Sequence, residues 1–505
     1  MTAGTERGMP GEVPVSGDTT RLGFYGGAAA SFVPFVVFIV AVVVLSLSGG
    51  FSLEAFVGFA VVGLILGAFL SRNWVTYWEA VMEGITDKST GILAAIFLLA
   101  GIFSNLMANG KLAEGLVWAG SSLGLMGRAF VGFTFVASLL FGLATGTSVG
   151  TVITMTPIFY PAGILLGGNP ILLLGAILSG AAFGDNLAPV SDTTIISASS
   201  QEYMRKAAYA EIGGVVRTRS KYAIIAATVS LVLYLLLGEA AATPVAGGAD
   251  ILAQYSYPKG LVMLIPLVVV IVLAVSGRSI FAALTAGIVT GAIVGMLAGI
   301  LTPGSFLRVK DGGAAGIIPS GVGGVFAAIM MFIAIMAMMG VVRKSGALDR
   351  LIEWLVARVA ATPRGCEATI FGMTTLMDIL NSGITTSVVA IMGPIANNLG
   401  KRQRLHPYRR ANLVDGVGNS WAYFIPWSAF IFITLGIIGS MKEAYPFLVI
   451  PAPTSFFFAV FHPWLLWLVF LVAVITGFGR EFEGEDGRRI VAWFSNRIPE
   501  EALRS

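Results

Sequence analysis

Residues 184–194 read GDNLAPVSDTT and lie within a long apolar stretch. Two aspartates, Asp185 and Asp192, interrupt a segment that is otherwise long enough to cross a membrane as a helix. An ionised side chain at that depth costs at least about 2.5–3.5 kcal/mol, so charged residues in membrane segments usually serve a function. Pro189 removes a backbone donor and frees the carbonyls around it. The segment therefore predicts a broken membrane helix that carries a polar site.

The composition of the whole chain agrees with a membrane location. Of its 505 residues, 56% are hydrophobic and 11% are charged, whereas about 25% are charged in soluble proteins. The single cysteine, Cys366, excludes a disulfide scaffold, and a net charge of +4 gives no basic face for a nucleic acid. The chain has no phosphate-binding loop, metal-ligand spacing or nucleophilic triad. We therefore expect neither an enzyme nor a cofactor.

Apolar runs of about 20 residues predict plain membrane crossings. They lie near 29–48, 53–71, 90–108, 221–238, 260–276, 280–300, 323–342 and 459–477. Lys and Arg gather in residues 201–221 and 401–410, and such an excess is typical of cytoplasmic loops. We predict that both loops and both chain termini are cytoplasmic, in a multi-pass protein of a prokaryotic-type plasma membrane.

Two further apolar zones, 129–200 and 367–438, match each other at one constant offset. Pro157, Pro170 and Pro189 in the first zone correspond to Pro394, Pro407 and Pro426 in the second. The matches predict two repeats. The predicted organisation is a disordered cytoplasmic tail at 1–27, a first repeat at 28–238, an external linker at 239–257, a second repeat at 258–477 and a cytoplasmic tail at 478–505.

Charge differences between equivalent loops predict how the repeats are related. The loop 401–410 is strongly basic, while its counterpart 164–173 has no charged residue. Equivalent loops therefore lie on opposite sides of the membrane, which defines the inverted repeat of many secondary transporters. Inversion requires an odd number of crossings in each repeat. This requirement predicts re-entrant hairpins at 129–163 and 367–398.

The segments 171–200 and 411–438 are then single crossings, each interrupted by a polar patch that contains proline. The predicted fold class is an all-α polytopic membrane protein with two inverted-topology repeats. It has about ten membrane crossings, two re-entrant helical hairpins and two broken helices.

Breaks at matching positions of two halves indicate a binding site, because irregular backbone in the bilayer must be buried or line a water-filled cavity. The candidate cation- and proton-binding residues are Asp185, Asn186, Ser191, Asp192, Thr193 and Asp378. The candidate ligand-binding residues at the hairpin tips are Thr145, Thr147, Ser148, Asn381, Ser382 and Thr385. Secondary candidates are Asp415, Asn419 and Ser428.

A buried aspartate suits the exchange of a cation for a proton. Burial disfavours the ionised carboxylate and a bound cation favours it, so the two ions compete for one group. Hard cations such as Na+ prefer oxygen ligands, and we place Na+ at Asp185, Ser191 and Asn381. Two structural alternatives remain open at this stage. Asp192 with Ser191 suits the N-cap of a half-helix, and Asp415, which closely follows the basic loop 401–410, suits an interfacial charge pair.

The stretch GDNLAPVSDTTIISA at 184–198 resembles the NhaC-type Na+/H+ antiporter family, whose members carry a G-D-x-x-x-P-x-S-D-T-T run. The stretch TGTSVGT at 145–151 resembles the first hairpin of that family, and LVD at 413–415 and IPW at 425–427 are similar to its L-x-D and I-P-W elements. The resemblance implies inverted repeats, re-entrant hairpins and a dimer. It also implies a cation site at Asp185, Ser191, Asp192 and Thr193. The second hairpin departs from the family, since residues 385–387 read TTS where many members carry an acidic G-D-Q-Y element.

We therefore expect a secondary active Na+/H+ antiporter with alternating access. The alternative is a Na+- or H+-coupled symporter or exchanger of a small organic acid or amino acid, whose carboxylate the hairpin tips would hold. A channel is disfavoured, because paired hairpins with charged breaks suit alternating access. The expected partners are the lipid bilayer, the transported cation and proton, a small carboxylate or amino acid under the alternative, and a second copy of the chain. We expect no nucleic acid.

Overall fold

The computed structural model describes residues 21–50, 52–240, 254–310, 312–347, 350, 362–381 and 383–503. The first helices are α1 (Val33–Leu47), α2 (Leu53–Leu70), α3 (Trp74–Ile85), α4 (Lys88–Asn109), α5 (Leu112–Ser122), α6 (Gly127–Thr145), α7 (Ser148–Leu165), α8 (Pro170–Leu187), α9 (Asp192–Ser199) and α10 (Ile212–Leu237). They are followed by α12 (Leu264–Val275), α13 (Ile280–Leu297), α14 (Pro303–Phe306), α15 (Ile317–Ser345), α17 (Pro363–Leu380), α18 (Thr385–Arg402), α19 (Pro407–Gly418), α20 (Ala429–Met441), α21 (Phe461–Thr476) and α22 (Glu500–Leu503).

Short elements join these helices. The 3-10 turns are η1 (Ala28–Phe32), η2 (Pro258–Met263), η3 (Trp421–Tyr423), η4 (Pro453–Phe458) and η5 (Glu485–Gly487). Strand β1 (Arg308–Lys310) pairs with β2 (Gly313–Ala315), and β3 (Glu481–Glu483) pairs with β4 (Arg489–Val491), both antiparallel.

Ten of the described helical segments are long and apolar enough to cross a membrane. They are not the same ten segments that the sequence predicts as crossings. They include α6 and α7 of the first predicted hairpin, and they leave out α20 and α21, which are shorter apolar helices. The all-α polytopic class is confirmed. The inverted relation of the halves and the re-entrant path of the hairpins remain predictions.

The helices end where the sequence predicts breaks. Helix α6 ends at Thr145, and Gly146 turns the chain with a φ of 65°, which an L side chain rarely adopts. Between α8 and α9, the break spans residues 188–191 around Pro189. In the second half, α17 ends at Leu380 and α18 begins at Thr385, and α19 ends at Gly418 and α20 begins at Ala429.

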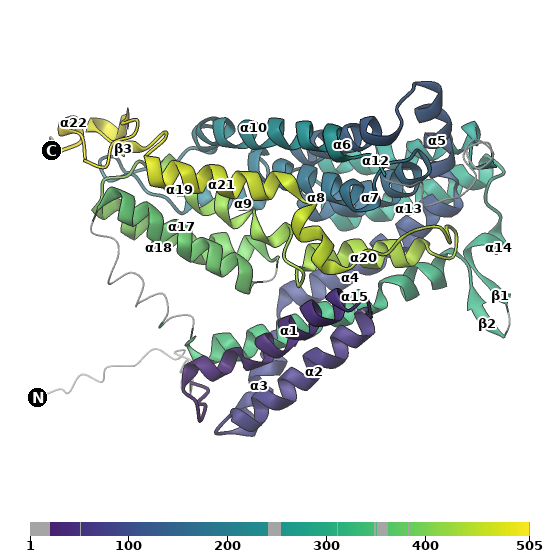
Figure 1. The fold of residues 1–505 in the computed structure, drawn as a ribbon, viewed down its shortest axis with the longest axis horizontal. Coiled ribbons are helices and arrows are strands. Elements are labelled where there is room, and N and C mark those ends of the chain that lie inside the picture. Colours follow the sequence, from purple (N-terminus) through teal and green to yellow (C-terminus); the bar gives the residue numbers. More distant parts are fainter. Residues whose placement is uncertain are drawn as a thin grey trace, which may run out of the picture.

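Helix packing brings these breaks together. Each broken helix packs against the hairpin of its own half, α8 against α6 and α7, and α19 against α17 and α18. Beyond the breaks the halves cross over, because α9 packs against α18 and α20 packs against α7. Figure 1 shows α17 and α18 towards the same end as β3, and α5, α13 and α14 towards the opposite end. The breaks therefore meet in the interior between the two ends.

Glycines allow α8 to lie unusually close to α6. A Cβ atom at Gly184 would lie 2.2 Å from the carbonyl carbon of Gly142, and one at Gly180 would lie 2.5 Å from the Cβ atom of Ser138. Small residues permit such close approach of helices in membrane proteins. This contact fixes the position of the last turn of α8, which carries Asp185.

The prediction that residues 201–221 and 401–410 are loops is wrong for part of each segment. Helix α10 already begins at Ile212 and α19 at Pro407. The guanidinium groups of three arginines on these helices are buried and paired. Arg219 pairs with Asp415, Arg409 pairs with Glu367, and Arg410 donates to Asn397. Counting Lys and Arg along the sequence identifies the basic ends of helices but not the partners that allow an arginine to be buried.

The predicted disordered tail at 1–27 is too long. Leu22 and Phe24 are buried, and Phe24 forms a β-bridge with Ser71 and packs edge-on against Tyr77. These contacts hold residues 22–24 against the body of the protein. Residues 1–20, residues 241–253 of the predicted linker, residues 504 and 505, and the hairpin-tip candidate Ser382 lie outside the described residues.

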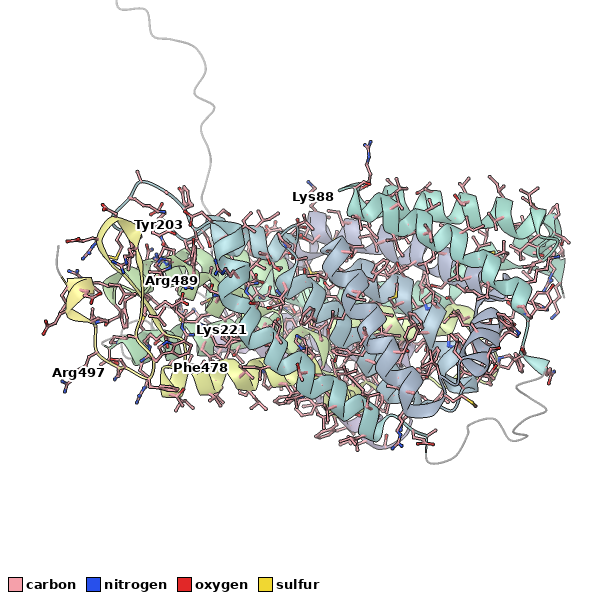
Figure 2. All side chains as sticks on the ribbon, turned by 90° about the horizontal axis from the view of Figure 1, so that it is seen from above. Lys88, Tyr203, Lys221, Phe478, Arg489 and Arg497 are labelled. Carbon is pink, nitrogen blue, oxygen red and sulfur yellow. The ribbon has the colours of Figure 1, made fainter. Side chains whose placement is uncertain are left out.

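The segment after Gly479, predicted as a cytoplasmic tail, packs onto the end where α17 and α19 begin. Arg480 and Arg409 both donate to Glu367, at 2.8 Å from its Oε2 and Oε1 atoms respectively. The backbone N–H of His406 donates to the carbonyl of Glu481. Burial lowers the pKa of the His406 imidazole to about 3, so this residue stays neutral at physiological pH. Figure 2 shows Tyr203, Lys221, Arg489 and Arg497 gathered at this end.

Candidate functional site

Asp185 is the centre of the candidate site. It lies in the last turn of α8, and its side chain is buried. Its Oδ1 atom accepts a hydrogen bond from Ser191 Oγ at 2.5 Å, and its Oδ2 atom accepts from Ser148 Oγ at 3.1 Å and from Tyr423 OH at 3.3 Å. Ser191 belongs to the break after α8, Ser148 to the first hairpin tip and Tyr423 to the break after α19. Three of the chain breaks therefore hold one carboxylate through neutral hydroxyl groups.

A cavity of about 410 Å³ lies beside Asp185. Its wall combines the tips of both hairpins with the first residues of α4, α9 and α13. The polar and glycine residues that line it are Ser89, Gly146, Thr147, Ser148, Asp185, Asp192, Thr193, Ser279, Gly383, Thr385, Thr386 and Ser387. The cavity therefore gives small polar solutes a place next to the buried carboxylate.

Ser191, Ser148 and Thr193 form one hydrogen-bonded group with Asp185. The hydroxyl groups of Ser191 and Thr193 lie 3.0 Å apart. Asp192 is exposed on the cavity wall, and no hydrogen bond joins it to Asp185 within the described chain. Asn186 points away from the cavity, and its Nδ2 atom donates to the carbonyl of Asp415 at 3.3 Å. Ser148, Ser191 and Thr193 thus lie around Asp185, whereas Asn186 belongs to a neighbouring network. The role of these residues in cation binding remains a prediction.

Two candidates at the first hairpin tip have local backbone partners. Thr145 donates to the carbonyl of Phe141 at 2.9 Å, one turn earlier in α6. Thr147 caps α7, because its Oγ1 atom accepts from the N–H of Gly150 at 3.2 Å. Thr147 also lines the cavity. These contacts shape the tip that brings Ser148 to Asp185.

Candidates in the second half stabilise its breaks. Asp378 is fully buried, and its Oδ2 atom accepts from the N–H of Ala422 at 3.2 Å, while its Oδ1 atom has no partner among the described residues. Asn381 donates to the carbonyl of Met377 at 2.9 Å, and Ser428 accepts from the N–H of Phe430 at 3.0 Å. No described contact joins Asn381 to Asp185, so its share in a Na+ site remains a prediction.

Thr385 is the exception in the second half. Its side chain is buried and lines the cavity, and its hydroxyl group has no hydrogen-bond partner among the described residues. It is the first residue of α18. The unpaired N–H groups at a helix N-terminus favour negative charge. This part of the wall is therefore suited to an anionic group.

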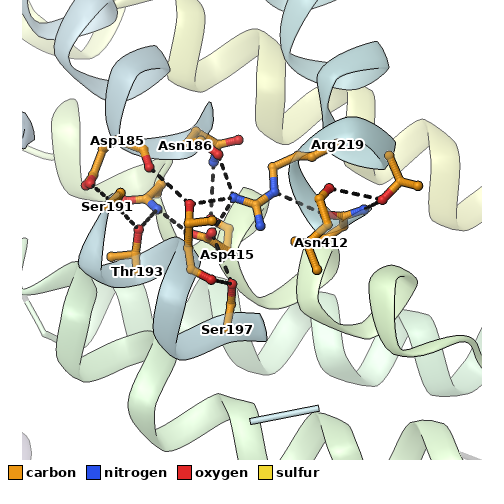
Figure 3. A network of polar contacts seen from close by, with 12 residues as sticks. Asp185, Asn186, Ser191, Thr193, Ser197, Arg219, Asn412 and Asp415 are labelled. Atoms are coloured by element: carbon orange, nitrogen blue, oxygen red, sulfur yellow. Dashed lines mark hydrogen bonds and ion pairs between the residues drawn. The ribbon is translucent and has the colours of Figure 1, made fainter. Parts of the chain in front are cut away.

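One alternative from the sequence was that Asp415 forms an interfacial charge pair with the basic loop 401–410. The structure does not show such a pair among the residues that it describes. The side chain of Asp415 and that of Arg219, from α10, are both fully buried and form an ion pair. Figure 3 shows this pair beside Asp185, with Asn186, Ser197 and Asn412 around it. A buried charge is tolerated only when it is paired and hydrogen-bonded. Asp415 can therefore be buried as a charged group because Arg219 pairs with it.

Two residues of the site, Arg219 and Tyr423, are not among the candidates that the sequence predicts. Arg219 stands at the basic start of α10, where it looks like one more cytoplasmic charge. Tyr222 and Ala226 follow Arg219 at intervals that place all three residues on one face of the helix, and all three are buried. That spacing is a signal for a buried arginine. Tyr423 lies among the aromatic residues Trp421, Phe424 and Trp427, and nothing in this short run singles it out.

Comparison with known proteins places the chain among transporters. A model of the Na+/H+ antiporter family matches residues 21–239 and 207–464. A malate-2H+/Na+-lactate antiporter of Bacillus subtilis is 27% identical over 46% of the chain and 48% of its own length. An arginine/ornithine antiporter of Halobacterium salinarum is 28% identical over 46% of the chain and 48% of its own length. The Na+/H+ antiporter NhaC of Alkalihalophilus pseudofirmus is 21% identical over 59% of the chain and 66% of its own length.

The chain spans about half the length of the first two of these relatives and about two thirds of the third. Two of the three names describe exchange of an organic solute, and two of the three include Na+. All three describe antiport.

Proposed function

Because the chain belongs to the Na+/H+ antiporter family, we propose that it is a secondary active transporter that exchanges Na+ for H+, with Asp185 as the group that both ions share. The observation that supports this proposal is the environment of Asp185. Its carboxylate is buried, lies on the cavity wall and receives three hydroxyl hydrogen bonds. No Lys or Arg of the described chain pairs with it. The negative charge of Asp185 is thus left for a cation or a proton to neutralise.

The hydroxyl groups around Asp185 suit both loaded states. Each hydroxyl donates to the ionised carboxylate, and its oxygen keeps lone pairs for a cation. A Na+ ion that enters from the cavity would meet the Oδ2 atom together with the Ser148 oxygen, which also lines the cavity. A proton on Asp185 removes the charge that attracts Na+. One site then holds either ion but not both, which is the requirement for exchange.

The cavity indicates the side from which the site is reached. Its wall includes Ser89 and Ser279, at the beginnings of α4 and α13. The predicted topology puts both on the cytoplasmic side. We therefore interpret this conformation as open to the cytoplasm, in a protein of a prokaryotic plasma membrane with both termini inside. By analogy with its family we expect a homodimer.

Cysteine labelling tests the inverted arrangement. Ser122, before the first hairpin, and Arg402, after the second, are both exposed. We expect Ser122→Cys to react with a membrane-impermeant maleimide added outside intact cells, and Arg402→Cys to react only after the membrane is opened. The native Cys366 is buried, so its background should be small. Labelling of both positions from the same side would contradict the inverted topology.

Ion flux tests the exchange itself. Purified protein in liposomes with an acidic lumen should raise the luminal pH when Na+ is added outside, because inward Na+ movement drives protons out. The same concentration of choline should leave the lumen acidic. A wild-type protein that moves no protons until an organic solute is added would contradict Na+/H+ exchange.

The cavity favours a second candidate, the exchange of a small carboxylate or amino acid coupled to Na+ or H+. A volume of about 410 Å³ falls in the range of about 300–1,000 Å³ that is usual for organic ligands, and is far larger than one Na+ requires. Thr385 with the start of α18 would receive a carboxylate, and Asp185 the cation. The relatives named for malate, lactate, arginine and ornithine fit this alternative. Counterflow of radiolabelled malate or arginine, absent from empty liposomes, would identify it.

A further inference from the structure

The ion pair behind Asp185 links two broken helices. The Arg219 guanidinium, from α10, pairs with the Oδ2 atom of Asp415 on α19. It also donates to the backbone carbonyl of Asn186 at 2.6 Å, and its Nε atom donates to the amide oxygen of Asn412 at 3.1 Å. Arg219 therefore connects the end of α8 to the middle of α19.

The two neighbouring carboxylates, Asp415 and Asp185, differ in what compensates their negative charge. Arginine remains protonated in proteins, so Asp415 has a permanent positive partner inside the molecule. Asp185 has only the hydroxyl groups of Ser148, Ser191 and Tyr423. A cation or proton is needed to compensate Asp185 but not Asp415.

Hydrogen bonds connect the ion pair to the carboxylate. Asn419 donates from Nδ2 both to Asp415 Oδ1, at 2.6 Å, and to Thr193 Oγ1, at 3.1 Å. The Thr193 hydroxyl lies 3.0 Å from that of Ser191, which donates to Asp185. The position of the Ser191 hydroxyl thus depends on Asp415 through two intermediate side chains.

We propose that Arg219 is a positioning residue that keeps Asp415 out of the exchange and, through Asp415, Asn419 and Thr193, holds the Ser191 hydroxyl against Asp185. Asp415 then carries neither the cation nor the proton, although it lies deep in the protein. This inference rests on the proposed function and deepens it. It states which of two buried carboxylates exchanges ions.

Paired neutral substitutions test this proposal. Arg219→Gln leaves Asp415 as an uncompensated buried charge, and Asp415→Asn does the same to Arg219. Each single variant should lower the melting temperature of the purified protein and reduce Na+-driven proton flux by at least about tenfold, since breaking a buried pair is strongly unfavourable. The double variant Arg219→Gln/Asp415→Asn should recover most of the melting temperature and of the proton flux. It leaves neither charge unpaired, so the effects of the two substitutions are not additive.

The Na+ dependence of the flux separates positioning from a merely structural role. In Arg219→Gln the free Asp415 carboxylate competes for Na+, so the apparent KM for Na+ should change by about threefold or more, while the double variant returns towards the wild-type KM. The matched control is Arg409→Gln, which breaks the buried pair with Glu367 at the cytoplasmic end. It should lower the melting temperature and the amount of active protein but leave the KM for Na+ unchanged.

Several outcomes would overturn the inference. If Asp415→Asn is inactive and the double variant stays inactive although folded, Asp415 is itself an ion ligand. If Arg219→Gln keeps the wild-type melting temperature and KM, the pair does not position the site. A wild-type protein without Na+-driven flux would contradict only the proposed function, because the coupling in melting temperature needs no flux. In that case, additive effects of the two single substitutions would overturn the inference.

Discussion

Replacing Asp185 with Asn is expected to abolish Na+-driven proton flux. The amide has nearly the shape of the carboxyl group and can still accept from Ser191 and Ser148, so the fold around it should persist. It can neither bind a proton nor balance the charge of Na+. A positioned group that transfers protons contributes about 100-fold or more, and we expect a loss of at least that size. Flux in liposomes and the melting temperature of the same preparation provide the measurement.

Asp192→Asn is the matched control for this substitution. Asp192 lines the same cavity and lies close to Asp185 in sequence, but it is exposed and shares no hydrogen bond with Asp185. Exposed charges in water contribute little to local interactions. We expect Asp192→Asn to lose much less flux than Asp185→Asn, and this comparison separates the buried carboxylate from the exposed one in the same cavity wall. A fully active Asp185→Asn protein would show that another group carries the ions.

The second large effect is expected from Gly184→Ala. The added methyl group would lie 2.2 Å from the carbonyl carbon of Gly142 and 2.6 Å from the nitrogen of Leu143, both backbone atoms that cannot turn aside. Helices α6 and α8 must separate, which costs about 1–3 kcal/mol or more by analogy with overpacked cores. Because Asp185 is the next residue, the carboxylate moves away from Ser148. A melting temperature lowered by several degrees and a loss of most flux are the expected results.

Gly372→Ala is the control for the glycine substitution. Gly372 also lies in a helix, α17, but a Cβ atom there would meet nothing within 4 Å. Alanine is the better helix former, so this variant should be as stable as the wild type or slightly more stable. An unchanged melting temperature in Gly184→Ala would mean that α6 and α8 do not need their close contact.

Local signals in the sequence indicate the breaks and the residues near Asp185 in its own half, Ser148, Ser191 and Thr193. Proline, glycine and hydroxyl residues mark the breaks at Pro189 and Gly146, although Pro157 and Pro394 lie inside helices α7 and α18. The partners across the fold were not accessible in this way. Arg219 and Asp415 are far apart in the chain, and nothing near either residue reveals the other. Tyr423 reaches Asp185 only because α19 ends where it does.

Contacts between residues far apart in the chain also explain why the predicted boundaries of the loops and tails differ from the structure. The rule that counts Lys and Arg near membrane spans treats every charge as solvated. Arg409 and Arg480 instead share Glu367 inside the protein. The apolar pair Leu22 and Phe24 was too short a signal to mark an ordered segment within a polar tail. The length of apolar runs therefore locates most of the apolar helices, but it does not locate their ends accurately.

Because α9 packs against α18 and α20 packs against α7, the two halves of the chain build the region around Asp185 together. Asp185 and Ser148 come from the amino-terminal half, whereas Tyr423 and the Thr385 side of the cavity come from the other. Neither half alone encloses a full set of oxygens around the carboxylate. Expressed as separate polypeptides, each half would carry only some of the hydroxyl groups that contact Asp185, and only reassembly of the two halves would restore all of them.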